Sequence, residues 1–226
     1  MADAEYRSYA MTGAERPLAI DLFAGTGSAT LGFREAGWSV IEVDLARPPA
    51  NGRPARDGHR SGGRVLADCR RLPFGRTARV EFLWASPPCT EFSDADSRVD
   101  HTRKHPSLEL VFATMAAVAE LRPRFWILEN VRGAIPFLGI PAQKVGPFCL
   151  WGYFPAIDST WEAGTYQKAT AGRSAIARAV IPPALARAVY QAVDRGRRLR
   201  LGRCGRRGGL GGGGGAHHEG GGRGGA

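Results

Sequence analysis

The chain has 226 residues, of which 43% are hydrophobic, and this supports one globular domain with a buried core but not two. No apolar run approaches the ~20 residues of a membrane span, and residues 1–14 lack the apolar core of a secretory signal, so we expect neither membrane insertion nor export. The four cysteines lie far apart without a C-x-x-C pair, which argues against a metal site or a disulfide framework and favours a reducing, cytoplasmic setting.

Apolar strands and helices alternate along the chain. The first half predicts strand 18–23, a turn at Gly25-Thr26-Gly27, helix 29–36, strand 38–44, a Pro/Gly/Arg-rich loop at 47–64 and strand 65–68. The second half predicts strand Val80–Ala85, a polar loop to about residue 106, a helix that Ser107 caps and Pro123 ends, strand 125–128, strand 147–154 and helix 183–193. This order predicts an α/β, Rossmann-like fold, a mostly parallel sheet with helices on both faces.

The spacing of apolar residues predicts one apolar face on the helix between Ser107 and Pro123. Apolar side chains recur near helical spacing at Leu108, Val111, Phe112, Met115, Val118 and Leu121. We expect that face to cover the sheet.

The C-terminal end of the chain differs from the rest in composition. From Arg195 onward there are eight arginines against one acid, Glu219, so +7 of the formal net charge of +10 lies there and +3 remains for residues 1–194. A Gly/Arg-rich segment cannot bury enough apolar surface to order itself. We therefore expect an arm at 1–16, a folded domain at 17–195 and a disordered tail at 196–226. The tail either holds a polyanion non-specifically or is a solubilising extension.

Three strand ends carry a glycine turn and two acids. A glycine turn alone is weak evidence, because many α/β proteins use one for close packing. However, Glu42 ends the second strand 21 residues after Asp21, where an acid can accept hydrogen bonds from both ribose hydroxyls. Asp68 ends the third strand, where a carboxylate can accept one from an adenine amino group. The glycine turn, Glu42 and Asp68 together predict an adenosyl pocket without a phosphate site. Asp21 and Asp44 could instead cap turns.

Two further strand ends carry a thiol and a carboxyl group. Ser86-Pro87-Pro88-Cys89 follows the fourth strand, and Glu129-Asn130-Val131 follows the fifth. The carboxyl ends of parallel strands meet at one crevice, so both groups are expected there. A thiol nucleophile beside a proton donor can attack an unactivated pyrimidine ring. The alternative for Cys89 is a buried, inert cysteine.

These motifs, with Asp21-Leu22-Phe23-Ala24-Gly25-Thr26-Gly27 ahead of them, resemble those of the DNA cytosine-5 methyltransferases, which use S-adenosylmethionine. The resemblance covers residues 17–135 well and 173–193 weakly, and the compact form is similar to phage-type and bacterial members, some of them partners in restriction-modification. It implies a class I methyltransferase fold. It also implies a monomer that binds double-stranded DNA with the target cytosine flipped out of the stack, and no metal.

The resemblance also implies which residues form the site. The cofactor-binding set consists of Asp21, Phe23, Gly25, Thr26, Gly27, Glu42, Val43, Asp68, Cys69 and Pro88. Cys69 is expected to be an apolar wall rather than a reactive thiol, and Val43 replaces the family's aromatic. The catalytic set is Cys89, which adds to cytosine C6, Glu129, which protonates N3, and Ser86 and Asn130 beside them. Glu129 can donate only if a closed, dry pocket keeps it partly protonated.

The chain departs from the family at several places. Thr90-Glu91 replaces the usual Gln-Pro before Phe92-Ser93, and Ala179 stands where most members have a cofactor-binding Asn. The arginine-bearing Gln-x-Arg-x-Arg element is missing, with Gln143-Lys144-Val145 as a remnant, and Arg132, Lys144 and Arg173 are candidate substitutes. The target-recognition region is reduced to residues 136–172. The basic loop 90–105 is either a lid over DNA or an ordinary solvated loop.

Three functions remain open from the sequence. The leading one is methylation of cytosine C5 in DNA. An alternative is the same chemistry on RNA, since one branch of the family methylates tRNA. A DNA-binding or regulatory protein that keeps the cofactor pocket without turnover is the third.

Overall fold

The computed structural model describes residues 16–46, 62–75, 79–93, 106–160 and 180–204. In chain order its elements are β1 (Leu18–Leu22), α2 (Leu31–Glu35), β2 (Ser39–Asp44), β3 (Gly62–Leu66), β4 (Val80–Ala85), α3 (Glu109–Leu121), β5 (Phe125–Asn130), the 3-10 helix η2 (Arg132–Ala134), α4 (Ile135–Leu138), β6 (Gln143–Val145), β7 (Phe148–Tyr153) and α7 (Pro183–Cys204). No helix within these ranges combines the length and apolar character that crossing a bilayer requires.

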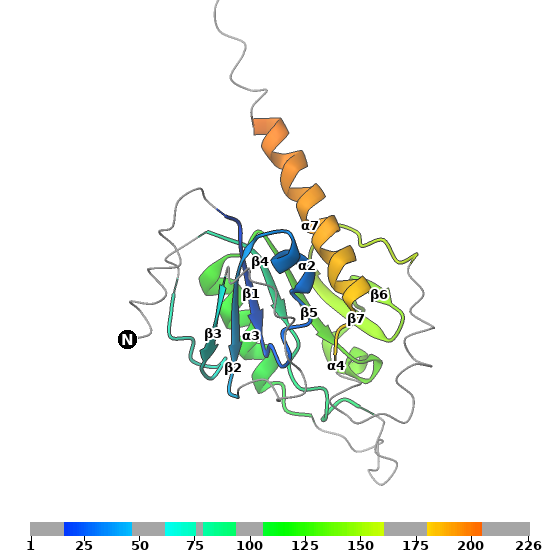
Figure 1. Ribbon diagram of the computed structural model, residues 1–226. Coiled ribbons are helices and arrows are strands. Elements are labelled where there is room, and N and C mark those ends of the chain that lie inside the picture. The colour runs from blue at the N-terminus through cyan, green and yellow to red at the C-terminus, as the bar shows by residue number, and fades with distance from the viewer. Residues whose placement is uncertain (1–15, 47–61, 76–78, 94–105, 161–179, 205–226) are drawn as a thin grey trace, which may run out of the picture.

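The strands of the described residues form one seven-stranded sheet in the order β3-β2-β1-β4-β5-β7-β6 (Figure 1). The pairs β1–β2, β2–β3, β1–β4 and β4–β5 are parallel, and β7 runs antiparallel to β5 and β6. The chain moves outward from β1 to β3 and then returns to β4 on the other side of β1. Such a switch point opens a crevice at the carboxyl ends of the strands. The predicted Rossmann-like, mostly parallel fold is confirmed.

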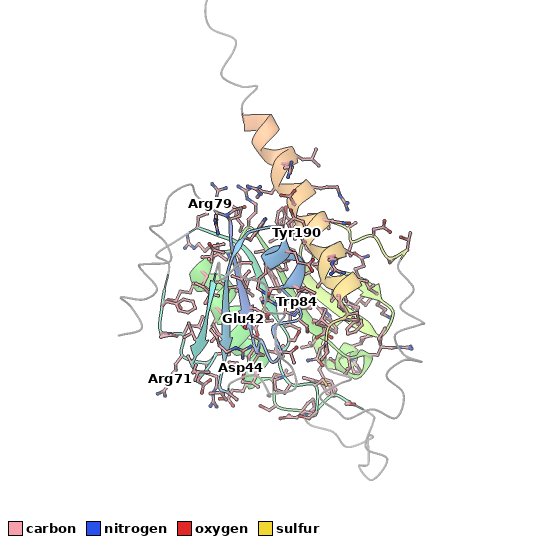
Figure 2. All side chains as sticks on the ribbon, in the orientation of Figure 1. Glu42, Asp44, Arg71, Arg79, Trp84 and Tyr190 are labelled. Carbon is pink, nitrogen blue, oxygen red and sulfur yellow. The ribbon has the colours of Figure 1, made fainter. Side chains whose placement is uncertain are left out.

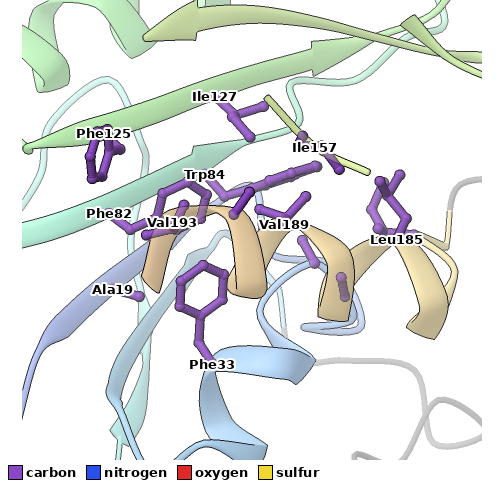
Figure 3. Close-up of a cluster of buried hydrophobic side chains, with 14 of the residues drawn as sticks. Ala19, Phe33, Phe82, Trp84, Phe125, Ile127, Ile157, Leu185, Val189 and Val193 are labelled. Carbon is purple, nitrogen blue, oxygen red and sulfur yellow. The ribbon is translucent and has the colours of Figure 1, made fainter. Parts of the chain in front are cut away.

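Helices cover both faces of the sheet, as predicted. α2 and α7 cover one face, where Phe33 of α2 stacks on Phe82 of β4 with ring centroids 4.6 Å apart, and Trp84 and Leu185 are fully buried (Figure 3). The two helices touch at Gly32, where a Cβ would lie 2.8 Å from the carbonyl oxygen of Ala186. Only glycine allows this approach. α3 covers the opposite face with a second cluster of buried residues.

The apolar face of α3 differs in part from the predicted one. Val111 and Leu121 are buried, but Phe112 is 65% exposed and Met115 41% exposed. Thr114 and Ala117 are buried in their place. Thr114 can be buried because its hydroxyl donates to the carbonyl oxygen of Leu110 at 3.0 Å, which satisfies the group inside the helix.

Two segments are more ordered than the sequence predicts. The strand expected at 147–154 is β7, and it pairs with β6 as a hairpin, so part of the expected recognition region 136–172 belongs to the main sheet. α7 begins at the predicted Pro183 but continues to Cys204, into the segment expected to be a disordered tail. Asp194 supports this continuation, because it accepts hydrogen bonds from Arg197 and Arg198, three and four residues later.

Candidate active site

A pocket of about 490 Å³ lies at the carboxyl ends of β1, β2 and β4. Residues from these strand ends, the loop after β4 and the start of α3 line it: Phe23, Gly25, Asp44, Leu45, Asp68, Cys69, Arg70, Ser86, Pro87, Pro88, Thr90, Glu91, Phe92, Ser107, Glu109, Leu110 and Val111. Its volume is within the range of small-molecule sites. Five predicted cofactor residues line it, namely Phe23, Gly25, Asp68, Cys69 and Pro88.

The turn after β1 explains why its glycines are needed. Phe23 has φ 58°, Gly25 φ 51° and Gly27 φ 72°. A phenylalanine in the left-handed region is uncommon and costs energy, so such positions concentrate at functional sites. The Gly25 amide donates to Asp44 Oδ2 at 2.7 Å, and the Gly27 amide donates to the carbonyl oxygen of Ala24 at 2.6 Å. The turn is thus held open towards the pocket.

Glu42 lies behind this turn. Arg34 and Arg64 both form ion pairs with its carboxylate, the Arg64 pair at 3.0 Å. The same arginines donate to the carbonyl oxygens of Gly27 and Gly25. A Cβ on Gly27 would lie 2.2 Å from Glu42 Oε1, so Glu42 packs directly against the glycine. Glu42 and Gly27, both predicted to bind the cofactor, are therefore absent from the pocket lining, and Glu42 supports the glycine turn from behind through two guanidinium groups.

Two predicted cofactor residues are buried structural groups. Asp21 is 1% exposed and accepts a hydrogen bond from the Thr30 hydroxyl at 3.1 Å, and burial raises its pKa well above the usual value. Val43 is 0% exposed and packs in the core between the sheet and α3. Because β2 alternates its side chains between faces, Val43 points away from the side that carries Glu42 and Asp44. Asp21 and Val43 therefore do not line the pocket, and neither does the part-buried Thr26.

Asp68 stands at the pocket as predicted, but an arginine engages it. The Arg70 amide and guanidinium both donate to its carboxylate, and Arg70 also donates to Glu109 at 3.0 Å. These hydrogen bonds hold the pKa of Asp68 below its usual value. Burial raises the pKa of the neighbouring Cys69 thiol to about 11. Cys69 is thus a protonated wall of the pocket, as expected, and not a nucleophile.

The charge of the pocket fits an S-adenosylmethionine cofactor. One lining residue, Arg70, is basic. Four are acids, namely Asp44, Asp68, Glu91 and Glu109. A net negative lining repels phosphates and favours a cationic sulfonium. Apolar side chains such as Phe23 and Leu110 supply a surface for an adenine ring. The acidic and apolar lining residues therefore fit an adenosyl group attached to a positively charged sulfur.

The loop after β4 brings Cys89 to the same edge. Its carbonyl oxygen accepts from the amides of Phe92 at 3.0 Å and Ser93 at 2.8 Å, so the chain turns immediately after the half-buried thiol. The Asn130 side chain donates to the carbonyl oxygen of Pro87 at 3.0 Å and accepts from the Val131 amide. Asn130 thereby ties the end of β5 to the Pro-Pro-Cys loop, rather than bracing Glu129 directly.

Glu129 lies beside Ser86 at the end of β5, where burial favours its neutral form. In the pairing of β4 with β5, Ala85 lies opposite Leu128, so Ser86 and Glu129 follow side by side. Burial raises the pKa of Glu129 to about 7, although a hydrogen bond from Ser86 opposes the shift. The Ser86 hydroxyl accepts from Trp84 Nε1 at 2.6 Å, which leaves its own proton for Glu129.

Comparison with known proteins identifies the family. Residues 18–137, more than half of the chain, match the model of the C-5 cytosine-specific DNA methylases. The chain belongs to the C-5 cytosine-specific DNA methylase family. The predicted resemblance is confirmed.

Relatives of this methylase-family chain include both short and long proteins. It is 35% identical over 117 residues to the type II methyltransferase M.HgiDI of Herpetosiphon aurantiacus, covering 51% of this chain and 37% of that one. M.HgiGI of the same organism is 33% identical over 117 residues, with 51% of this chain and 90% of the relative covered. DNA (cytosine-5)-methyltransferase 1 of Rattus norvegicus is 29% identical over 182 residues, with 72% and 11% covered. The chain thus spans well under half of M.HgiDI and of the rat protein.

The arginine-bearing element of the cytosine methylases has no counterpart on β6. Gln143 is used structurally, because its side-chain amide exchanges two hydrogen bonds with the backbone of Ile157. Lys144 lies opposite Cys149, which in turn lies opposite Asn130. Burial raises the pKa of Cys149, and the positive charges of Lys144 and Arg132 oppose that shift. Both candidate substitutes therefore lie near the end of β5, whereas Arg173, Ala179 and the loop 94–105 lie outside the described residues.

Several residues that line the pocket or support the site were not predicted from the sequence. Asp44 could have been found, since it follows Glu42 at the two-residue period of a strand that ends at the crevice. Arg70 and Glu109 carry no such signal, because their contact joins the loop after β3 to the start of α3. Trp84 is an apolar residue in a buried strand, so the sequence indicates only a core position. Its hydrogen bond to the Ser86 hydroxyl becomes evident only in the structure.

Proposed function

We propose that this chain catalyses the transfer of a methyl group from S-adenosylmethionine to C5 of cytosine in DNA. The observation that carries the proposal is a carboxyl group with a pKa of about 7, Glu129, at the end of the strand next to the one that delivers Cys89. A carboxyl group at this pKa can both hold a proton near neutral pH and give it up. Membership of the family supports the same conclusion.

In the proposed mechanism Cys89 acts first. Its thiolate adds to C6 of the ring, and the electrons of the C5–C6 bond move towards N3, where Glu129 supplies a proton. Cytosine thereby becomes an enamine, nucleophilic at C5. The cofactor, when bound, supplies a methyl group activated by a positive sulfur. Loss of the C5 proton to water then expels the thiolate, and N3 returns its proton to Glu129, which restores the neutral aromatic ring.

The remaining residues position these groups. Asn130 fixes the Pro-Pro-Cys loop against β5, and Ser86 fixes the carboxyl of Glu129. Phe23, Gly25, Asp44 and Asp68 line the pocket for the expected adenosyl group, and Glu42 supports the glycine turn behind it. Because Glu129 is part-buried, a cytosine must leave the base stack to reach it. Double-stranded DNA is therefore the proposed partner, bound by a monomer, with its base flipped into the crevice.

The test is methyl transfer from labelled cofactor to duplex DNA and, in parallel, to tRNA. We expect label in DNA, and covalent trapping of the protein by duplexes that contain 5-fluorocytosine, because fluorine cannot leave as the proton does. Label in tRNA alone would overturn the choice of substrate. Cofactor binding without transfer to either would indicate a DNA-binding or regulatory protein.

A further inference from the structure

Arginines gather at the edge of the sheet opposite the crevice. Arg16 precedes β1, Arg79 directly precedes β4 and Arg124 directly precedes β5, while Arg122 follows α3. The amino ends of these parallel strands share one edge, and the carboxyl ends with the pocket share the other. Figure 2 shows Arg79 and Asp44 at opposite ends of the sheet.

α7 adds further arginines to this edge. A Cβ on Gly196 would lie 2.5 Å from Pro155 and 3.1 Å from the ring of Phe125, the first residue of β5. The helix therefore crosses the start of β5 at Gly196. One residue later, Arg197 lies over the ring of Trp38, just before β2, at 5.5 Å from its centroid. Arg195 and Arg198 flank this crossing point.

The acids at this edge position the arginines without neutralising them. Glu81 pairs with both Arg79 and Arg124, and its side chain is 10% exposed. Asp194 in the same way holds both Arg197 and Arg198. Each carboxylate thus cancels one of the two charges it binds. Two further acids, Glu120 and Asp158, also lie nearby.

The count of charges leaves this edge basic. Among the residues that the structure describes, the four arginines near the strand and helix ends and the three of α7 face four acids, which gives a net charge of +3 (7 − 4). Two of the arginine side chains are largely exposed, with 68% for Arg79 and 72% for Arg198. Figure 1 shows the orange C-terminal turns of α7 projecting beyond the sheet on this side. The sequence places Arg200 and Arg203 on those turns.

We propose that this edge binds the sugar–phosphate backbone of a second DNA segment, separate from the segment whose cytosine enters the crevice. Guanidinium groups held in place by carboxylates are pre-organised to donate paired hydrogen bonds to phosphates. Such hydrogen bonds hold DNA without reading its sequence. The pocket lining carries a net negative charge, whereas the described part of the opposite edge carries a net positive one, which suits the phosphates of a second segment. The choice of DNA as occupant rests on the proposed function.

The proposal is tested on the full chain without cofactor, using a labelled duplex of only A·T pairs, which offers no target base. The variant Arg195→Gln/Arg198→Gln should bind it more weakly. The slope of log affinity against log salt should fall by about 0.9 for each phosphate that the variant no longer neutralises, so by up to about 1.8. Arg187→Gln is the matched control. Arg187 is also exposed on α7, but it lies near the start of this helix, where it pairs with Glu35. A double variant with the wild-type slope, or a control whose slope falls as much, would overturn the proposal.

A second measurement separates this site from the crevice. Wild-type protein trapped on a short 5-fluorocytosine duplex should still bind the A·T duplex, and the trapped double variant should lose that binding while trapping at the wild-type rate. Trapped wild-type protein that binds no second duplex would contradict a separate site. If no trapping occurs, the proposed function fails, but the salt-slope comparison still decides whether the edge binds DNA. The same salt-slope comparison is repeated with tRNA in place of the A·T duplex. Tighter binding of tRNA than of the duplex at this edge would overturn DNA as the occupant.

Discussion

Glu129 and Glu81 are two glutamates of neighbouring central strands, at opposite edges of the sheet and in opposite electrostatic surroundings. Glu81, the second residue of β4, lies between Arg79 at 2.8 Å and Arg124 at 3.3 Å. Glu129, near the end of β5, has a neutral hydroxyl partner, and no ion pair to it occurs among the described residues. A cation beside a buried carboxylate favours the charged form, whereas burial alone favours the neutral one. The placement of arginine therefore distinguishes Glu81, which is held in ion pairs, from Glu129, which burial favours in its neutral form and which we propose as the proton donor.

The largest effect expected at the crevice edge comes from Cys89→Ala. Methyl transfer should fall to background, because no other described thiol can replace it: Cys69 is a pocket wall whose pKa is about 11, and Cys149 is fully buried. Cofactor affinity measured by calorimetry should stay at the wild-type value, since the thiol acts on the base. Residual transfer above that of a no-enzyme control would contradict the assignment of the nucleophile.

Glu129→Gln tests the proton donor. The rate should fall more than tenfold, or about 1.4 kcal/mol of barrier. In the wild-type protein the rate should decline as pH rises through about 7, because the donor loses its proton there, and the variant should lack that limb of the profile. Glu81→Gln is the control: it should lower thermal stability by leaving buried arginine unpaired, and leave the pH profile unchanged.

The same Glu129→Gln variant should gain stability at alkaline pH. The raised pKa means that the folded protein holds a proton on Glu129 that the unfolded chain releases above its usual value of 4.5. The stabilising contribution is therefore complete below pH 4.5 and is lost as pH rises to about 7. At pH 8, Glu129→Gln should exceed wild type in unfolding free energy by about 1–3 kcal/mol. Equal denaturation midpoints at pH 8 would show that Glu129 is not desolvated.

Asp68→Ala and Glu42→Ala test the cofactor pocket. Each should weaken cofactor binding by about 1–3 kcal/mol, the scale for an unpaired polar group in a pocket. Glu42→Ala also leaves Arg34 and Arg64 without their shared carboxylate, which loosens the glycine turn. Thr26→Ala is a control for Asp68→Ala, because Asp68 lines the pocket and Thr26 does not. Unchanged affinity of both acid variants in calorimetry would place the adenosyl site elsewhere.

The smallest expected effect is that of Ser86→Ala. Removing the hydroxyl removes the hydrogen bond that opposes the rise in the pKa of Glu129. The descending limb of the pH–rate profile should therefore move to higher pH, by less than about one unit. Ser86→Thr should restore the wild-type midpoint, and Trp84→Phe should shift it part of the way. A midpoint that moves to lower pH would mean that Ser86 does not donate to Glu129.

The sequence predicted the sheet, the crevice and most of the motif positions, because each depends on local patterns. β1, β4 and β5 are apolar runs that end in distinctive residues. The spacing of apolar residues and the Gly, Pro or polar residues at the ends identify such runs in a sequence. The position of β6, the pairing of Arg70 with Glu109 and the partner of Trp84 depend on packing between distant segments, which one sequence does not encode locally. Val43 shows the limit of transferring a motif: it matched by position, but the strand period turns its side chain into the core.

The end of α7 was mispredicted for a related reason. Composition described the segment after Val193 as a Gly/Arg tail, but Gly196 packs on Phe125 and Arg197 on Trp38, so the helix continues across the sheet edge. Packing against distant residues thus outweighs the low helix preference of glycine.

α7 also connects the two edges of the molecule. Just before the helix, the Ile181 amide donates to the Ser28 hydroxyl beside the glycine turn, and the helix ends past the opposite edge at Cys204. Its first turns are clamped in the core at Leu185, Ala186 and Val189. For protein engineering this makes α7 a stiff attachment point: a sequence-specific DNA-binding module fused after Cys204 would be carried on the side away from the crevice. If the chain has the proposed activity, such a fusion would direct methylation to chosen loci without obstructing the entry of the target base.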